Sequence, residues 1–152
     1  MDTISPEHRS WNMSRIRGRN TRPEMLVRSL LHSLGYRFRL NRKDIPGKPD
    51  ILLPKYRTAI FVHGCFWHRH KDCGLAYEPK SNSDFWGKKF ARNIERDAEV
   101  SVALRVAGWR QLVIWECNTR DPIKLTIKLR RFLRSQVQAG RNSGIGSLSA
   151  EK

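Results

Sequence analysis

The chain has 152 residues, three of them cysteines, and its 30 lysines and arginines outnumber 14 acidic residues, for a formal charge of +16. This length predicts one domain whose core needs no disulfides, and the charge favours a nucleic acid or another phosphate-bearing partner, although basic ribosomal and membrane-surface proteins share it. No apolar run approaches the roughly 18 residues of a membrane span and the arginine-rich start has no signal-peptide core, so we expect a soluble, intracellular protein that does not bind membranes.

Residues 1–20 lack a sustained apolar period and are rich in arginine. We interpret them as a basic N-terminal arm whose isolated apolar side chains, Trp11, Met13 and Ile16, are available for contacts. A short amphipathic helix docked on the domain is the alternative.

A helix is predicted from Thr21 to about Gly35, because TRPE resembles a capping box with Pro23 in the first turn. Its expected apolar face consists of Met25, Leu26, Leu30, Leu31 and Leu34. Three strands follow: the alternating segment YRFRLN at 36–41, then KPDILLP and RTAIFVHG, which a tight turn near Pro54–Tyr56 would join.

A long helix is predicted to begin with Ser83 and Asp84 as caps and to end near Gly108. One stripe of this helix carries Phe90, Ile94, Ser101 and Leu104, and Asp97 falls on the same stripe. An inward carboxylate needs a partner, so we expect Asp97 to have one.

The last predicted elements are a strand at 109–117 and a helix that opens with Asp121 as N-cap and Pro122 as its first residue. Residues 135–152 are rich in serine and glycine and are predicted to be disordered. The expected fold is therefore α/β, a mixed sheet packed between helices in a single domain at 21–134.

The segment HGCFWHRHKDC, residues 63–73, favours a metal site. Cys65, His70 and Cys73 are close enough in sequence to bind Zn²⁺ from one loop, and Cys117 is the only thiol left for a fourth ligand. Such a closed site would be structural, because it leaves no position for water. Buried thiols beside an exposed histidine are the alternative.

Two further histidines of this segment, His63 and His68, are candidates for acid–base chemistry. Each taken alone is more often a structural histidine. A carboxylate from Asp97 beside His68 would fix its tautomer and raise its basicity. GKPD places Asp50 at the start of a strand, where a carboxylate beside a phosphate channel suits Mg²⁺. An ordinary strand start is the alternative for Asp50.

The motifs PGKPD, HGCFWHRHKDC, NIERD and WEC, together with the opening SPEHRSWNMSRIRGRNTRPE, resemble those of the very short patch repair endonucleases. The resemblance covers about residues 5–134. It implies a restriction-endonuclease-like fold of the PD-(D/E)xK superfamily. It also implies Mg²⁺-dependent nicking of double-stranded DNA on the 5′ side of the thymine in T:G mismatches that arise from deamination of 5-methylcytosine.

The resemblance also implies roles for single residues. Asp50 matches the magnesium ligand, His68 the general base with Asp97 behind it, His63 a histidine near the scissile phosphate, and Glu24 a further acidic residue. Cys65, His70, Cys73 and Cys117 match structural zinc ligands, and Met13, Phe66, Trp67 and Trp86 match aromatic or apolar residues that enter the DNA. Core packing would also explain Trp86, and the capping box would also explain Glu24.

The chain departs from the superfamily signature after Asp50, where Phe61, Val62 and His63 stand in place of a second acidic residue and lysine. Val62 replaces a hydroxyl residue that often precedes the histidine, so only its backbone carbonyl could bind the metal. The loop between His70 and Cys73 can also be shorter in relatives.

We therefore expect a monomeric bacterial DNA mismatch endonuclease, acting in the cytoplasm with the nucleoid, with Mg²⁺ for catalysis, Zn²⁺ for structure and other mismatch-repair proteins as candidate partners. A restriction-type nuclease, a nuclease for other mismatches and a zinc-stabilised DNA-binding protein without catalysis are the alternatives.

Overall fold

The computed structural model describes residues 20–149, with side chains through residue 135. The predicted arm and its Met13 lie outside the described residues. The described elements are helices α2 (Arg22–Ser33), α3 (Ser83–Val106) and α4 (Pro122–Ser149), strands β1 (Arg39–Leu40), β2 (Ile51–Leu53), β3 (Thr58–His63) and β4 (Arg110–Trp115), and 3₁₀ turns η1 (Pro54–Tyr56) and η2 (Glu116–Arg120).

The four strands form one sheet in the order β1-β2-β3-β4. β1, β2 and β3 pair antiparallel, whereas β3 and β4 pair parallel over six residues, from Thr58 opposite Arg110 to His63 opposite Trp115. The long helix α3 makes the crossover between these two parallel strands, as parallel pairing requires. The prediction of an α/β fold with a mixed sheet is confirmed.

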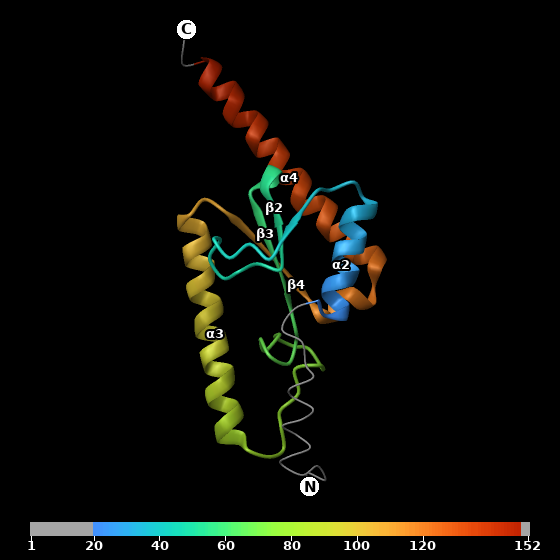
Figure 1. Cartoon of the computed structure of the whole chain (residues 1–152), viewed down its shortest axis with the longest axis vertical. Coiled ribbons are helices and arrows are strands. Elements are labelled where there is room, and N and C mark those ends of the chain that lie inside the picture. Colours follow the sequence, from blue (N-terminus) through green and yellow to red (C-terminus); the bar gives the residue numbers. More distant parts are fainter. Residues whose placement is uncertain (1–19, 150–152) are drawn as a thin grey trace.

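The sheet separates the helices into two layers (Figure 1): α3 covers one face, and α2 and α4 cover the other. Successive side chains of β2 point to opposite faces of the sheet and pack against the two helix layers in turn. Ile51 and Leu53 pack with α2 and α4, in a core that also contains Val27, Leu31, Ile60, Leu112, Ile114, Leu125, Leu129 and Leu133. Leu52 faces the opposite way and packs with Ile45, Ala59, Phe61 and Leu104.

The segment predicted as a strand at 36–41 forms a ladder at Arg39 and Leu40 alone. Its alternation is nevertheless as predicted, because Tyr36, Phe38 and Leu40 pack against the core. The strand is shorter because its neighbour β2 spans only Ile51–Leu53, and the 3₁₀ turn η1 begins at Pro54, opposite the first residues of the predicted strand.

Helix α2 begins at its predicted cap, where the Thr21 hydroxyl accepts a hydrogen bond from the Glu24 N–H at 3.4 Å. Its inward face differs from the prediction: Val27 and Leu31 are fully buried, whereas Met25 is 48% exposed. The predicted caps of α3 were also wrong, because Ser83 and Asp84 are its first two helical residues and Asn82 precedes them in a left-handed conformation.

The inward stripe of α3 is confirmed at Phe90 and Leu104, which are buried, but Ile94 is 52% exposed. Asn93 and Asp97 instead make the inward contacts near this turn, with the Trp67 carbonyl and with His68. Ile94 lies at the margin of that face, since a helical residue advances about 100° per step.

Helix α4 begins as predicted, with the Asp121 carboxylate accepting from the Lys124 N–H at 3.2 Å. The helix runs to Ser149, beyond residue 134, where the sequence places the end of the domain. The division into arm, domain and disordered tail stays a prediction. Among residues 20–149, no helix combines the length and apolarity needed to cross a bilayer.

Candidate active site

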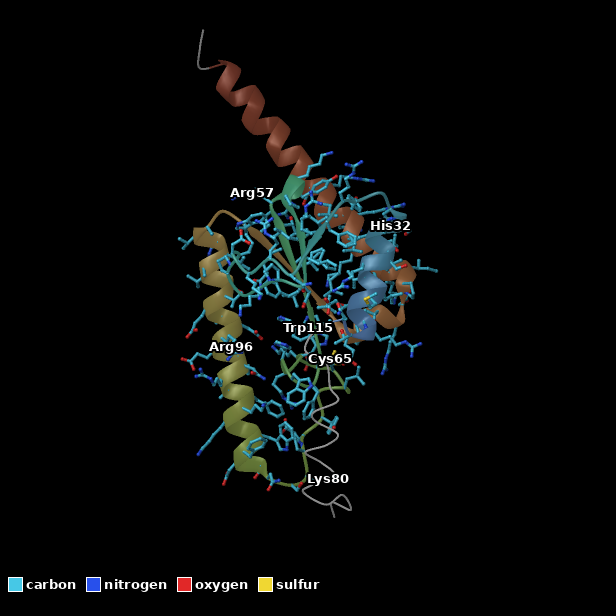
Figure 2. The ribbon with its side chains drawn as sticks, viewed as in Figure 1. His32, Arg57, Cys65, Lys80, Arg96 and Trp115 are labelled. Carbon is cyan, nitrogen blue, oxygen red and sulfur yellow. The ribbon has the colours of Figure 1, made fainter. Side chains whose placement is uncertain are left out.

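Three strands bring the candidate residues to one edge of the sheet. β2 is antiparallel to β3, so its start, preceded by Asp50, lies beside the end of β3 at His63. β4 is parallel to β3 and ends at the same edge. Figure 2 shows Cys65 and Trp115 together there, far from Arg57 at the opposite edge.

Asp50 is held by β3. The Val62 N–H donates to Oδ2 of Asp50 at 2.7 Å, and the other carboxylate oxygen has no hydrogen-bond partner among the described residues. Burial, together with the negative charge of Glu24, raises the pKa of Asp50 to about 6, although the Val62 hydrogen bond and the charges of Arg28 and His68 oppose the shift. A cation at Asp50 would offset the cost of ionising this carboxyl.

Glu24, on helix α2, is 2% exposed, and its charge contributes to the raised pKa of Asp50. Its carboxylate does not complete a capping box but pairs with Arg28, Oε1 to Nη2, at 2.5 Å. Arg28 was missed by the sequence interpretation, although a cation four residues after Glu24 on a helix is a recognisable pairing signal. Capping therefore involves only the N–H of Glu24, whereas its buried carboxylate pairs with Arg28.

His68 and Asp97 form the predicted pair, with Nδ1 of His68 at 2.7 Å from Oδ2 of Asp97. Since a carboxylate only accepts, this hydrogen bond places a proton on Nδ1 and leaves Nε2 as the nitrogen that can accept one. The carboxylate that helix α3 turns inward thus has the partner its position requires.

His63 stacks on His68, with ring centroids 3.7 Å apart and planes at 4°. Burial, followed by the nearby charge of His68, lowers the pKa of His63 to about 4. His63 is therefore neutral near pH 7 and can donate a hydrogen bond.

The predicted zinc ligands also meet at this edge. The ligand atoms of Cys65, His70, Cys73 and Cys117 all lie within 4.8 Å of one another. Nδ1 of His70 is 3.6 Å from Sγ of Cys65 and 3.4 Å from Sγ of Cys117. A tetrahedral zinc with typical bond lengths requires an S···N separation of about 3.6 Å, so the donor set fits Zn²⁺.

The position of Cys117 corrects one detail, because it lies in η2, after β4 has ended at Trp115. Burial raises the pKa of the Cys65 thiol to about 12, and a metal cation would be needed to hold it as thiolate. Trp115 lies between the two clusters: its ring stacks on His70 at 4.1 Å and meets His63 edge-on at 5.4 Å. No periodic pattern in the sequence predicts this bridging position of Trp115.

The predicted DNA-entering aromatics form a further group beside the histidines. Phe66 meets Trp67 and Trp86 edge-on at 5.3 Å, and Trp86 stacks on the buried Phe90 at 5.7 Å. We call Phe66, Trp67, Trp86 and Phe90 the aromatic cluster. The first three are partly exposed. Trp86 therefore packs within the cluster and keeps part of its side chain at the surface.

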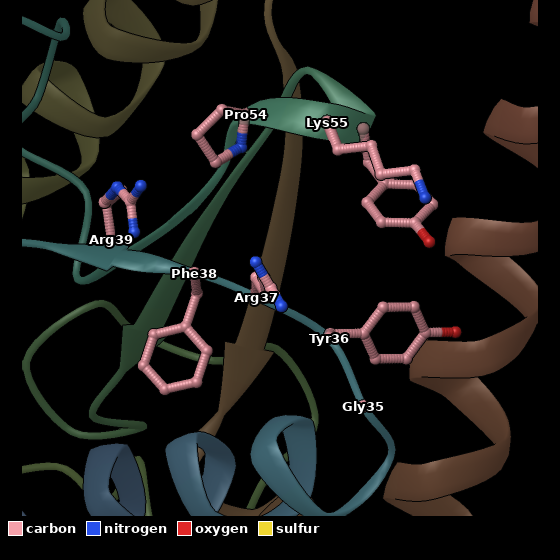
Figure 3. A pocket seen from close by; sticks show the side chains of 8 residues that line it. Gly35, Tyr36, Arg37, Phe38, Arg39, Pro54 and Lys55 are labelled. Carbon is pink, nitrogen blue, oxygen red and sulfur yellow. The ribbon is translucent and has the colours of Figure 1, made fainter.

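The donors around Asp50 suit a hard cation. A carboxylate oxygen of Asp50, the carbonyl of Val62 and the carboxylate of Glu24 offer oxygen, the atom that Mg²⁺ prefers. A separate cavity of about 280 Å³ lies at the other edge of the sheet, between Gly35–Arg39 and Pro54–Tyr56 (Figure 3). It contains none of the predicted site residues.

The chain is similar in sequence to known proteins over most of its length. The family model for DNA mismatch endonuclease Vsr matches residues 1–75. A type II nicking enzyme, V.XorIIP from Xanthomonas oryzae pv. oryzae, is 51% identical over 132 residues, covering 87% of this chain and 96% of the relative. DNA mismatch endonuclease Vsr from Escherichia coli is 43% identical over 118 residues, covering 78% and 75%. The chain belongs to the Vsr family of DNA mismatch endonucleases.

Membership of the Vsr family makes the chain a hydrolase that cleaves phosphodiester bonds in DNA. A second nicking enzyme, V.NmeAIP from Neisseria meningitidis, is 41% identical over 133 residues, covering 88% of this chain and 94% of the relative. The prediction of the family and of an endonuclease is confirmed. The roles of the individual Vsr site residues stay predictions.

Proposed function

We propose that this chain is a Mg²⁺-dependent endonuclease that nicks double-stranded DNA on the 5′ side of the thymine in T:G mismatches. The observation that carries the proposal is the convergence of Asp50 with His63 and the His68–Asp97 pair at one sheet edge. The names of two relatives support the two parts of this proposal. The name "mismatch endonuclease" indicates a mismatched substrate, and the name "nicking enzyme" indicates cleavage of one strand.

In this proposal Asp50 and the Val62 carbonyl would hold Mg²⁺, with Glu24 as a further acidic residue near the site. The bound ion would polarise the scissile phosphate and lower the pKa of the attacking water. Nε2 of His68 accepts the proton of that water, while Asp97 keeps the proton on Nδ1 and stabilises the imidazolium that forms. Neutral His63 donates a hydrogen bond to the phosphate or to the leaving oxygen.

Zn²⁺ at Cys65, His70, Cys73 and Cys117 would link the loop of residues 63–73 to η2 and take no part in the reaction. Both histidines and two aromatic residues, Phe66 and Trp67, belong to that loop. A fixed loop would therefore hold the proposed general base, His68, and the proposed apolar wedge, Phe66 and Trp67, in place together. Apolar wedges unstack a mismatched step at lower cost than a paired one, which is a physical source of mismatch selectivity.

The charge of +16 supports binding to the DNA backbone. We further propose that the protein is a monomer in the bacterial cytoplasm, where it acts at the nucleoid. Other mismatch-repair proteins are its proposed partners.

A substrate panel tests the proposed specificity. Duplexes of one sequence, each strand labelled in turn, carry a T:G pair, another mismatch or a matched pair, and several flanking contexts are included. We expect a single nick 5′ of the mismatched thymine. Cleavage of the matched duplex at the same rate as the T:G duplex would indicate a restriction-type nuclease. Selective binding of the mismatched duplex without cleavage would indicate a DNA-binding protein.

A further inference from the structure

Arg69 makes an unusual number of contacts for a loop arginine. Its guanidinium donates to the carbonyls of Phe66, Ala76 and Tyr77 at 3.3, 3.0 and 3.1 Å, and to the Glu78 carboxylate at 2.7 Å. The Arg69 side chain is 14% exposed. These four hydrogen bonds from one planar guanidinium hold the loop of residues 76–78 beside Phe66, the first residue of the aromatic cluster.

The same guanidinium also packs on the long helix. Its central carbon lies 4.2 Å from the centroid of the Phe90 ring. A guanidinium over an aromatic face gains cation–π attraction, which is stronger where water is excluded. Arg69 therefore joins three parts of the structure: the loop of residues 63–73, the loop of residues 76–78 and helix α3.

The result of this arrangement is the position of Tyr77. Its ring centroid lies 4.9 Å from that of Phe66, with the planes tilted by 32°. Tyr77 is 63% exposed, and within residues 20–135 its ring contacts no aromatic ring other than that of Phe66. Phe66 itself is partly covered by Trp67, Trp86 and Phe90. Most of the Tyr77 ring is therefore free to meet a ligand at the edge of the aromatic cluster.

The surroundings indicate what that ligand is. Lys89 lies over the Trp67 ring at 5.6 Å, so a cation stands beside the exposed aromatic surface. Flat aromatic side chains next to cations stack bases and contact phosphates in proteins that bind unstacked nucleic acid. A tyrosine held rigidly in such a position loses little conformational entropy when a base stacks on it.

We propose that Tyr77 is a further DNA-stacking residue, extending the surface of Phe66, and that Arg69 is the positioning residue that holds it there. The inference rests on the proposed function, in which the aromatic cluster meets DNA at the mismatch. It adds a stacking partner for a base that the wedge displaces, and it assigns the loop of residues 76–78 to mismatch recognition.

The test is binding of the full chain to a T:G duplex in the absence of Mg²⁺, with the fluorescent base 2-aminopurine next to the mismatched thymine. The variants are Tyr77→Ala, Tyr77→Phe and Arg69→Met, and Val106→Ala is the control, since Val106 is 83% exposed near the end of α3. Tyr77→Ala carries the test because this exposed side chain supports no core packing.

We expect Tyr77→Ala to weaken binding to the mismatched duplex roughly 5- to 150-fold, the range for loss of one stacked base, with a smaller fluorescence rise. Tyr77→Phe keeps the ring and should bind as wild type does, and no variant should change affinity for matched duplex. Arg69→Met should lower the ratio of mismatched to matched affinity, and adding Tyr77→Ala to it should change that ratio little, because both act through one ring.

Wild-type affinity and fluorescence in Tyr77→Ala would overturn the inference. If Phe66→Ala loses mismatch binding while Tyr77→Ala does not, Tyr77 has no stacking role and the proposed function stands. If wild type itself shows no preference for the T:G duplex and no nicking with Mg²⁺, the proposed function fails first.

Discussion

The pairing of His68 with Asp97 gives the sharpest quantitative prediction. Asp97→Asn keeps the size of the side chain but replaces an acceptor-only carboxylate with an amide that can also donate. The 2.7 Å bond to Nδ1 then no longer specifies which nitrogen carries the proton. The proton-accepting Nε2 is lost in part of the molecules, and the remaining imidazolium is less well stabilised.

The magnitude follows from the geometry. A hydrogen bond to a charged group contributes about 1.5–3 kcal/mol, equivalent to roughly 10- to 100-fold in rate. Removing the general base itself should have a larger effect, about 10²- to 10⁴-fold for His68→Ala. Since both side chains are about 30% exposed, at 27% and 30%, the pair should add no more than about 1 kcal/mol to stability.

The assay is single-turnover nicking of a T:G duplex at saturating enzyme and Mg²⁺, beside thermal unfolding and DNA affinity. Glu99→Gln is the matched control, because it removes the same charge from an exposed position of α3. We expect a lower rate constant for Asp97→Asn with DNA affinity and unfolding temperature close to wild type. An unchanged rate constant would refute the role assigned to this carboxylate.

The remaining predictions concern the metal sites and the fold. Nicking should fall as pH drops below about 6, because protonated Asp50 cannot hold a cation and its pKa is raised to about 6; a rate independent of pH between 5 and 7 would contradict this. That pKa lies above the value of about 4 for an unfolded chain, so Asp50 stabilises the folded state below pH 4 and this contribution is lost as the pH rises through 6. Without Mg²⁺, Asp50→Asn should therefore be more stable than wild type between pH 5 and 7, as urea titrations would show. Cys117→Ser should lower the zinc content from one per chain and the unfolding temperature, as metal analysis and calorimetry would show; full zinc content would remove Cys117 from the site. Leu129→Ala should cost about 2–5 kcal/mol in urea unfolding, because Leu129 is 0% exposed in the core, whereas Ile127→Ala, at 53% exposed, should cost far less.

Local sequence patterns were informative where they reflect burial or ligand chemistry. The alternation at residues 36–41 and the inward position of Asp97 follow from strand and helix periodicities. The turn at Pro54–Tyr56 follows from its turn residues. The cluster of cysteines and a histidine could be predicted because two cysteines and one histidine lie close together in one loop and one further thiol remains for a fourth position.

Other features could not be predicted, because they depend on contacts between segments that have no common period. Arg69 holds the loop of residues 76–78 through main-chain carbonyls, which leave no trace in sequence. Trp115 bridges two clusters by ring stacking, and Ile94 is exposed because the inward face of α3 is centred on Asp97 instead. Glu24 was explained by local capping, whereas its carboxylate serves an ion pair with Arg28.

The most direct test of the account compares wild type with Asp50→Ala on a T:G duplex, with and without Mg²⁺. The account predicts a magnesium-dependent nick 5′ of the thymine in wild type, and in the variant mismatch-selective binding with no nick. A nick of equal rate in Asp50→Ala, or selective binding by wild type that never leads to cleavage, would contradict it.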